Sequence, residues 1–133
     1  MDLSALGLKA SGYYRCMMSS EYHGALSPQL LDAIRKRESI PVHFPEKSDI
    51  FSLGVTMLSA ATNIHYAMFY DFDNYRFKYD YVAEKLVEMI GSGYSKLLVG
   101  CIGNMLQEKE SGRPSVRDLM NFINVNSDVN RRN

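Results

Sequence analysis

The sequence is poor in cysteine and shows no arrangement of residues that would hold a metal ion. Its two cysteines, Cys16 and Cys101, are far apart and form no C-x-x-C motif, which is typical of reduced thiols in a cytoplasmic protein. The three histidines, His23, His43 and His65, have no carboxylate or cysteine companion at ligand spacing. We therefore expect no metal site, no cofactor and no catalytic histidine.

An excess of one charge and a long hydrophobic run are also missing. Fifteen basic and fifteen acidic residues cancel, so we expect no nucleic-acid partner and no electrostatic attraction to a membrane surface. The most apolar segment is too short and too interrupted to span a bilayer. Residues 1–7 lack the basic region and the apolar stretch of a signal peptide. The 133 residues predict about one cytoplasmic domain.

The most informative segment is residues 47–58, Lys-Ser-Asp-Ile-Phe-Ser-Leu-Gly-Val-Thr-Met-Leu. An acidic residue, Asp49, opens a stretch that is apolar on nearly every side of a helix, interrupted by Gly54 and by small hydroxyl side chains. A helix that is apolar all round belongs inside a core. The segment therefore predicts a central buried helix.

Apolar spacing elsewhere predicts four more helices and no strand. Ser27 can cap a helix with Pro28 in its first turn, and Ser115 with Asp118 resembles a capping box. The helical patterns cover residues 27–37, 82–90, 98–105 and 116–123, and residues 124–133 read as a frayed tail. The aromatic segment 63–81 is either an exposed docking surface or a long loop packed on the core, and we favour the packed loop.

Three motifs in this order resemble the large lobe of eukaryotic protein kinases. Residues 47–58 resemble its central helix, Ser27-Pro28-Gln29 resembles the Ala-Pro-Glu element, and Arg113-Pro114-Ser115 resembles the turn before its last helix. The resemblance implies a mainly α fold, the helical portion of a kinase-like large lobe from the activation segment onward. It implies an irregular, activation-segment-like stretch over residues 1–26, a helical domain over 27–125 and a polar tail over 126–133.

The resemblance also assigns structural roles. In the family, the residues matching Gln29 and Arg113 form a buried ion pair, and Gln29 stands where the family has Glu. Asp49 matches an aspartate that binds the catalytic loop, and a simple helix N-cap is the alternative. The motif positions are Ser27, Pro28, Gln29, Asp49, Gly54 and Arg113.

The N-terminal residues depart further from the family. Asp2-Leu3-Ser4 is either a relic of Asp-Phe-Gly or an ordinary N-terminus, and Glu21-Tyr22 falls where a Gly-Thr pair of the substrate-binding loop is usual. Tyr13, Tyr14, Ser19 and Ser20 fall where kinases carry activating phosphates. A phosphate needs arginines to order it, and the family's main one belongs to a His-Arg-Asp loop that this sequence lacks. We therefore expect a solvated loop there.

Catalytic motifs of the kinase family are not found in the 133 residues. There is no Gly-rich phosphate loop, no Val-Ala-Ile-Lys strand and no His-Arg-Asp triplet. We therefore expect no catalytic residue and no ATP binding in this chain, although whether it belongs to an enzyme stays open. The leading hypothesis is a kinase-like fragment or pseudokinase in interaction or regulation, with a protein partner or a missing N-terminal lobe. The alternatives are a C-terminal piece of an active Ser/Thr kinase and an unrelated helical adaptor, which would keep the Gln29 and Arg113 regions far apart.

Overall fold

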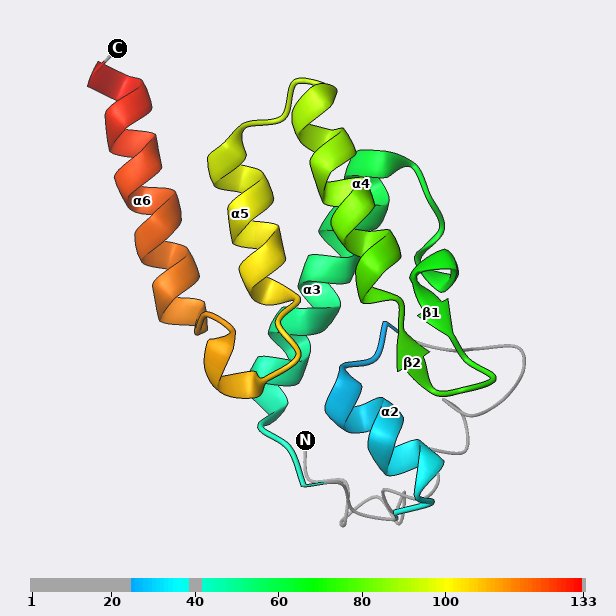
Figure 1. The fold of residues 1–133 in the computed structure, drawn as a ribbon. Coiled ribbons are helices and arrows are strands. Elements are labelled where there is room, and N and C mark those ends of the chain that lie inside the picture. The colour runs from blue at the N-terminus through cyan, green and yellow to red at the C-terminus, as the bar shows by residue number, and fades with distance from the viewer. Residues whose placement is uncertain (1–24, 39–41, 133) are drawn as a thin grey trace.

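The computed structural model describes residues 25–38 and 42–132, with side chains described as far as residue 125. The described part is mainly helical, as the sequence predicts, and Figure 1 shows the central helix α3 with α2, α4 and α5 arranged around it. The elements are α2 (Pro28–Arg35), α3 (Pro45–Thr62), the 3-10 turn η1 (Tyr66–Phe69), β1 (Tyr70–Asp71), β2 (Arg76–Phe77), α4 (Tyr79–Gly91), α5 (Lys96–Met105), the 3-10 turn η2 (Glu110–Gly112) and α6 (Val116–Arg132).

Helix α3 supplies the centre of the core. Phe51, Val55 and Leu58 on one side of it are fully buried. Pro45 occupies the first turn, where its missing N–H costs nothing, and Asn63 ends the helix in the left-handed conformation. The sequence therefore predicts the helix and its core position correctly.

Burial of α3 is nevertheless incomplete, although the helix lies in the core as expected. Leu53 is 46% exposed, and Thr56 and Ala60 on the same face are exposed too. The N-cap alternative for Asp49 is wrong, because the helix begins at Pro45 and Asp49 is an exposed residue inside it. Two prolines within residues 41–46 are typical of a loop, but in the structure the second of them starts the helix.

The aromatic segment forms a small hairpin that the apolar spacing did not predict. Strands β1 and β2 pair antiparallel, with Tyr70 opposite Phe77. Each strand has two residues, too few for an alternating pattern to be visible in the sequence. Packing holds the hairpin to the core, because the Phe77 ring meets the Phe51 ring edge-on at 4.9 Å and the Tyr70 hydroxyl donates to the Leu26 carbonyl at 2.7 Å. The expectation that these aromatics cover the core is confirmed for Phe69, Tyr70 and Phe77, which are buried.

Helices α2, α4 and α5 lie where the spacing predicts them. Ser27 caps α2 by accepting a hydrogen bond from the Leu30 amide at 3.3 Å, and Ser95 caps α5 in the same way from Leu98 at 3.1 Å. Helix α5 packs on both α3 and α4. The inward residues of α4 and α5 are Val82, Met89, Val99, Ile102 and Met105.

Helix α6 matches its predicted start but not its predicted burial. Ser115 and Asp118 form the expected reciprocal cap, with both hydrogen bonds at 3.0 Å. However, Val116, Met120 and Ile123 are 48%, 58% and 59% exposed, so the predicted apolar face does not enter the core. Figure 1 shows α6 standing beside α5 at the edge of the molecule. The helix continues to Arg132, beyond the expected end at residue 123, because neither Gly nor Pro interrupts it.

Gly54 marks the closest approach of α3 to the end of α5. A Cβ atom placed there would lie 3.0 Å from Leu106 Cδ2 and 3.0 Å from Met105 Cβ. We expect Gly54→Ala to lower the free energy of unfolding by about 1–2 kcal/mol, because overpacking outweighs the gain in helix propensity. Urea unfolding followed by circular dichroism measures the change.

Gly100 in α5 is the matched control for this substitution. A Cβ atom there would meet nothing within 4 Å. Gly100→Ala should therefore stabilise the protein by about 0.5–1 kcal/mol. If Gly54→Ala stabilises the protein as Gly100→Ala does, the two helices do not approach as closely as described.

Candidate functional site

A buried arginine joins segments from both ends of the described chain. Arg113 is only 2% exposed, and its guanidinium donates four hydrogen bonds. Its Nε donates to the Gln107 carbonyl at 2.7 Å, and Nη1 donates to the Lys47 carbonyl at 3.2 Å. Its Nη2 donates to Gln29 Oε1 at 2.7 Å and to the Glu108 carbonyl at 2.9 Å. Each of these four acceptors is neutral, and among the described residues no carboxylate forms an ion pair with Arg113.

The surroundings of Arg113 explain how the charge is held. The guanidinium carbon lies 4.9 Å from the centre of the Phe51 ring, a cation–π contact inside the core. Burial lowers the pKa of Arg113, and the nearby Tyr79 and Glu110 partly oppose that shift. Arginine stays protonated in proteins even so. The site is therefore a cation solvated by carbonyl groups and one aromatic face.

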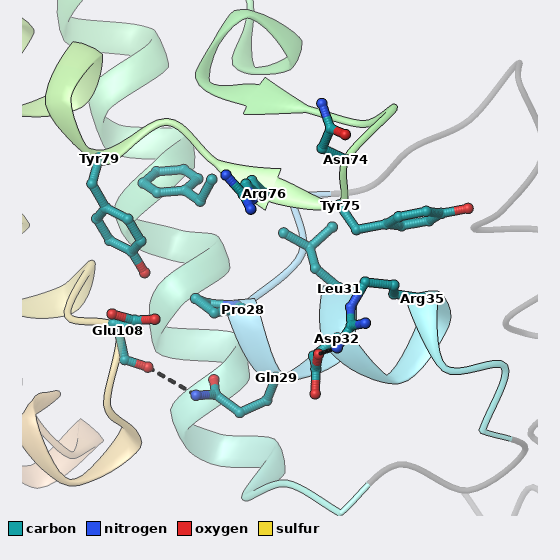
Figure 2. Close-up of a pocket in the computed structure, with 11 residues that line it drawn as sticks. Pro28, Gln29, Leu31, Asp32, Arg35, Asn74, Tyr75, Arg76, Tyr79 and Glu108 are labelled. Atoms are coloured by element: carbon teal, nitrogen blue, oxygen red, sulfur yellow. Dashed lines mark hydrogen bonds and ion pairs between the residues drawn. The ribbon is translucent and has the colours of Figure 1, made fainter.

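Gln29 uses both ends of its amide in this site. Its oxygen accepts from Arg113, and its Nε2 donates to the Glu108 carbonyl at 2.8 Å (Figure 2). The residue sits in the first turn of α2, where the Ser27 cap and Pro28 set the start of the helix. A glutamate at this position would gain a charged partner but lose the donor to Glu108.

A row of polar side chains fixes α2 to the start of α3. The hydroxyl oxygens of Ser27 and Ser48 are 3.1 Å apart, and Nδ1 of His43 lies 2.8 Å from the Ser48 oxygen. Both serines are buried. A buried serine beside a histidine has no route to a substrate, so this arrangement positions the chain rather than providing a nucleophile.

Further hydrogen bonds connect the start of α3 to the turn around Arg113. The Lys47 ammonium donates to the Arg113 carbonyl, so each of these two residues donates to the backbone of the other. The Phe44 amide donates to Glu110 Oε2 at 2.6 Å, and the Val116 amide donates to Glu46 Oε1 at 3.0 Å. The loop before α3 and the turn before α6 are thus one connected unit.

The structure brings together most of the motif positions. Ser27, Pro28, Gln29 and Arg113 meet at one junction, and the expected contact between Gln29 and Arg113 is present. Gly54 lies apart, at the α3–α5 approach, and Asp49 faces solvent. The following expected features lie outside the described residues: Asp2-Leu3-Ser4, Tyr13, Tyr14, Cys16, Ser19, Ser20, Glu21-Tyr22 and His23.

Several groups at this junction could not be predicted from the sequence. The carbonyl groups of Lys47, Gln107 and Glu108 carry no side-chain signature, so no pattern could have identified them. Ser48 lies inside the recognised motif, and a serine there could have suggested a polar contact. The pairing of His43 with Ser48 has no signal beyond a spacing of five residues.

Candidate metal ligands and reactive nucleophiles are few among the described residues. Residues 25–38 and 42–132 contain no group of three or more histidine, cysteine or acidic side chains that could hold a metal ion. Burial raises the pKa of the Cys101 thiol, which disfavours the reactive thiolate. Helix by helix, the described part of the chain offers no segment that is both long and apolar enough to cross a membrane.

Comparison with protein families, with curated proteins and with solved structures gives no match.

Removal of the Arg113 side chain should strongly lower the free energy of unfolding. Arg113→Ala leaves the carbonyls of Gln107 and Glu108 without this donor and opens a cavity beside Phe51. We expect a loss of at least about 3 kcal/mol in the free energy of unfolding, measured by urea denaturation. Arg117→Ala, an exposed change on α6, should cost under about 0.5 kcal/mol. Equal small effects of the two changes would show that Arg113 is not buried.

A carboxylate at position 29 should raise the free energy of unfolding by binding Arg113. Gln29→Glu replaces a neutral acceptor by a charged one and loses one neutral hydrogen bond, so we expect a net gain of about 1 kcal/mol at pH 7. A carboxyl group beside a cation has a depressed pKa. The gain is therefore present above the unfolded pKa of about 4.3 and is lost as the pH falls through the lower folded value.

The control for this change is Gln107→Glu, which adds the same charge to an exposed side chain nearby. It should alter stability by less than about 0.5 kcal/mol. The gain from Gln29→Glu should also vanish in the Arg113→Ala background, or in Arg113→Lys if the alanine variant does not fold. A gain that is the same with and without the arginine would mean that the two side chains do not touch.

Proposed function

We propose that this chain is the helical large-lobe portion of a protein kinase-like domain that acts in protein interaction or regulation rather than in phosphoryl transfer. The observation that carries the proposal is the hydrogen bond between Arg113 and Gln29, two residues 84 positions apart. The kinase resemblance expects this contact, and apolar periodicity alone does not.

Two further observations support the same architecture. Ser27 and Ser48 come from the first two motifs, and their hydroxyl groups meet in the core. Gly54, the glycine of the central-helix motif, lies where any side chain would press on Leu106 and Met105. Ser27, Ser48 and Gly54 thus have packing roles that fit the kinase-like arrangement, whereas Asp49 faces solvent.

The interaction role is proposed because the chain carries no set of residues for phosphoryl transfer. Kinase catalysis depends on positioning ATP and magnesium with a lysine, an aspartate and an asparagine held by particular loops. The sequence contains none of the motifs that supply them. The described aromatic and helical elements instead share one core and leave exposed apolar side chains on α3 and α6.

Two other functions remain alternatives. A C-terminal piece of an active Ser/Thr kinase would have an in-frame His-Arg-Asp encoded upstream of Met1, and the genomic sequence discriminates it. An unrelated helical adaptor would have no reason to place Gln29 against Arg113. The hydrogen bond between them weighs against that alternative.

The 133-residue chain should neither bind nor hydrolyse ATP. Isothermal titration of the chain with Mg-ATP should give no saturable heat at concentrations up to the millimolar range. An active kinase domain titrated under the same conditions is the positive control. One-to-one binding tighter than about 1 mM, which corresponds to about 4 kcal/mol, would contradict the proposal.

A further inference from the structure

Three side chains form a hydrogen-bond relay between the start of α2 and the loop before α3. The Oγ atoms of Ser27 and Ser48 lie 3.1 Å apart, and the Ser48 oxygen lies 2.8 Å from Nδ1 of His43. Both serines are buried, whereas the His43 ring is half-buried. Water can therefore deliver a proton to His43 but not to the serines.

The number of hydroxyl hydrogens determines the direction of the relay. Each serine has one, and the Ser27 oxygen already accepts a hydrogen bond from the Leu30 amide at 3.3 Å. Among the described residues, no other group accepts a hydrogen bond from either hydroxyl. Both hydrogens are therefore used in one order only, in which Ser27 donates to Ser48 and Ser48 donates to His43. In that order Nδ1 of His43 is free of hydrogen and Nε2 carries it.

We propose that this relay makes the junction between α2 and α3 sensitive to pH through His43. A protonated imidazole carries a hydrogen on both ring nitrogens, so its Nδ1 can no longer accept from Ser48. If the relay reverses, the buried Ser27 hydroxyl has no acceptor, and an unsatisfied buried donor is costly. If the ring turns away from Ser48 instead, the loop before α3 loses its hydrogen bond to the helix. Either response weakens the folded junction.

No charged side chain compensates for a proton on His43. Within the part of the chain that the structure describes, no carboxylate forms a hydrogen bond or ion pair with the ring. Glu46 and Glu110 accept from backbone amides instead, and Lys47 donates to a backbone carbonyl. The charged residues on the segments joined to the relay are Asp32, Arg35, Lys36, Arg37 and Glu38 in and after α2, Glu46, Lys47 and Asp49 of α3, and Glu108, Lys109, Glu110 and Arg113 before α6. The protonated ring therefore gains no ion pair to offset the lost hydrogen bond.

Urea unfolding of the full 133-residue chain tests the inference at about pH 7.5 and about pH 5.5, on either side of the ordinary imidazole value of about 6.5. The stabilisation is present while the ring is neutral and is lost as the pH falls through this range. The unfolding equilibrium constant of the unmodified chain should rise at least about fivefold at the lower pH, because one hydrogen bond is lost. In His43→Gln the rise should be absent, because an amide oxygen accepts at either pH.

His65→Gln is the matched control. Nδ1 of His65 also accepts a hydrogen bond, from the Ala67 amide at 3.2 Å, but this ring is exposed and water can replace it. The rise in this variant should stay within about twofold of that in the unmodified chain. Ser48→Ala, which removes the middle hydroxyl, should lose the rise as His43→Gln does.

Nitrogen-15 NMR of the His43 ring gives a second test that needs no variant. At the higher pH the neutral ring should carry its hydrogen on Nε2, as the direction of the relay requires. No rise in the unfolding constant at the lower pH, an equal rise in His43→Gln, or a hydrogen on Nδ1 of the neutral ring would each overturn the inference.

Discussion

The buried guanidinium of Arg113 is the interaction on which the rest of the structure depends. A charged group taken out of water must be hydrogen-bonded, and no carboxylate within the described part of the chain pairs with this one. The protein instead supplies three backbone carbonyls and one amide oxygen, drawn from α2, from α3 and from the turn before η2. These segments must come together for the arginine to be buried at all, which couples the folding of distant parts of the chain.

Other features follow from that junction. The face of Phe51 that meets the arginine fixes the rotation of α3, and the edge of Phe77 meets the same ring from the hairpin. Leu58 and Val55 are fully buried, α3 contacts both α4 and α5, and Gly54 permits the close approach at the end of α5. Helix α6 leaves the junction with its cap satisfied but with most of its apolar side chains exposed.

Helix positions could be predicted from the sequence because capping residues and apolar spacing are local signals. Ser27 with Pro28 and Ser115 with Asp118 marked two helix starts correctly. The hairpin could not be predicted, because its pairing depends on tertiary packing of Tyr70 and Phe77 rather than on alternation. The exposure of α6 was missed because amphipathic spacing predicts a face without predicting what covers it. Of the junction, the contact between Gln29 and Arg113 could be inferred from the kinase resemblance, whereas the carbonyl acceptors and the pairing of His43 with Ser48 could not.

The central claim is that Arg113 is buried and bound in a fixed orientation by carbonyl groups. Nitrogen-15 NMR of the guanidinium tests it directly, because bound and free arginine side chains exchange protons and rotate at different rates. The account predicts a resolved Nε–H signal that exchanges slowly with water, together with separate signals from the two Nη groups. A single averaged Nη signal and exchange as fast as that of the exposed Arg117 would contradict it.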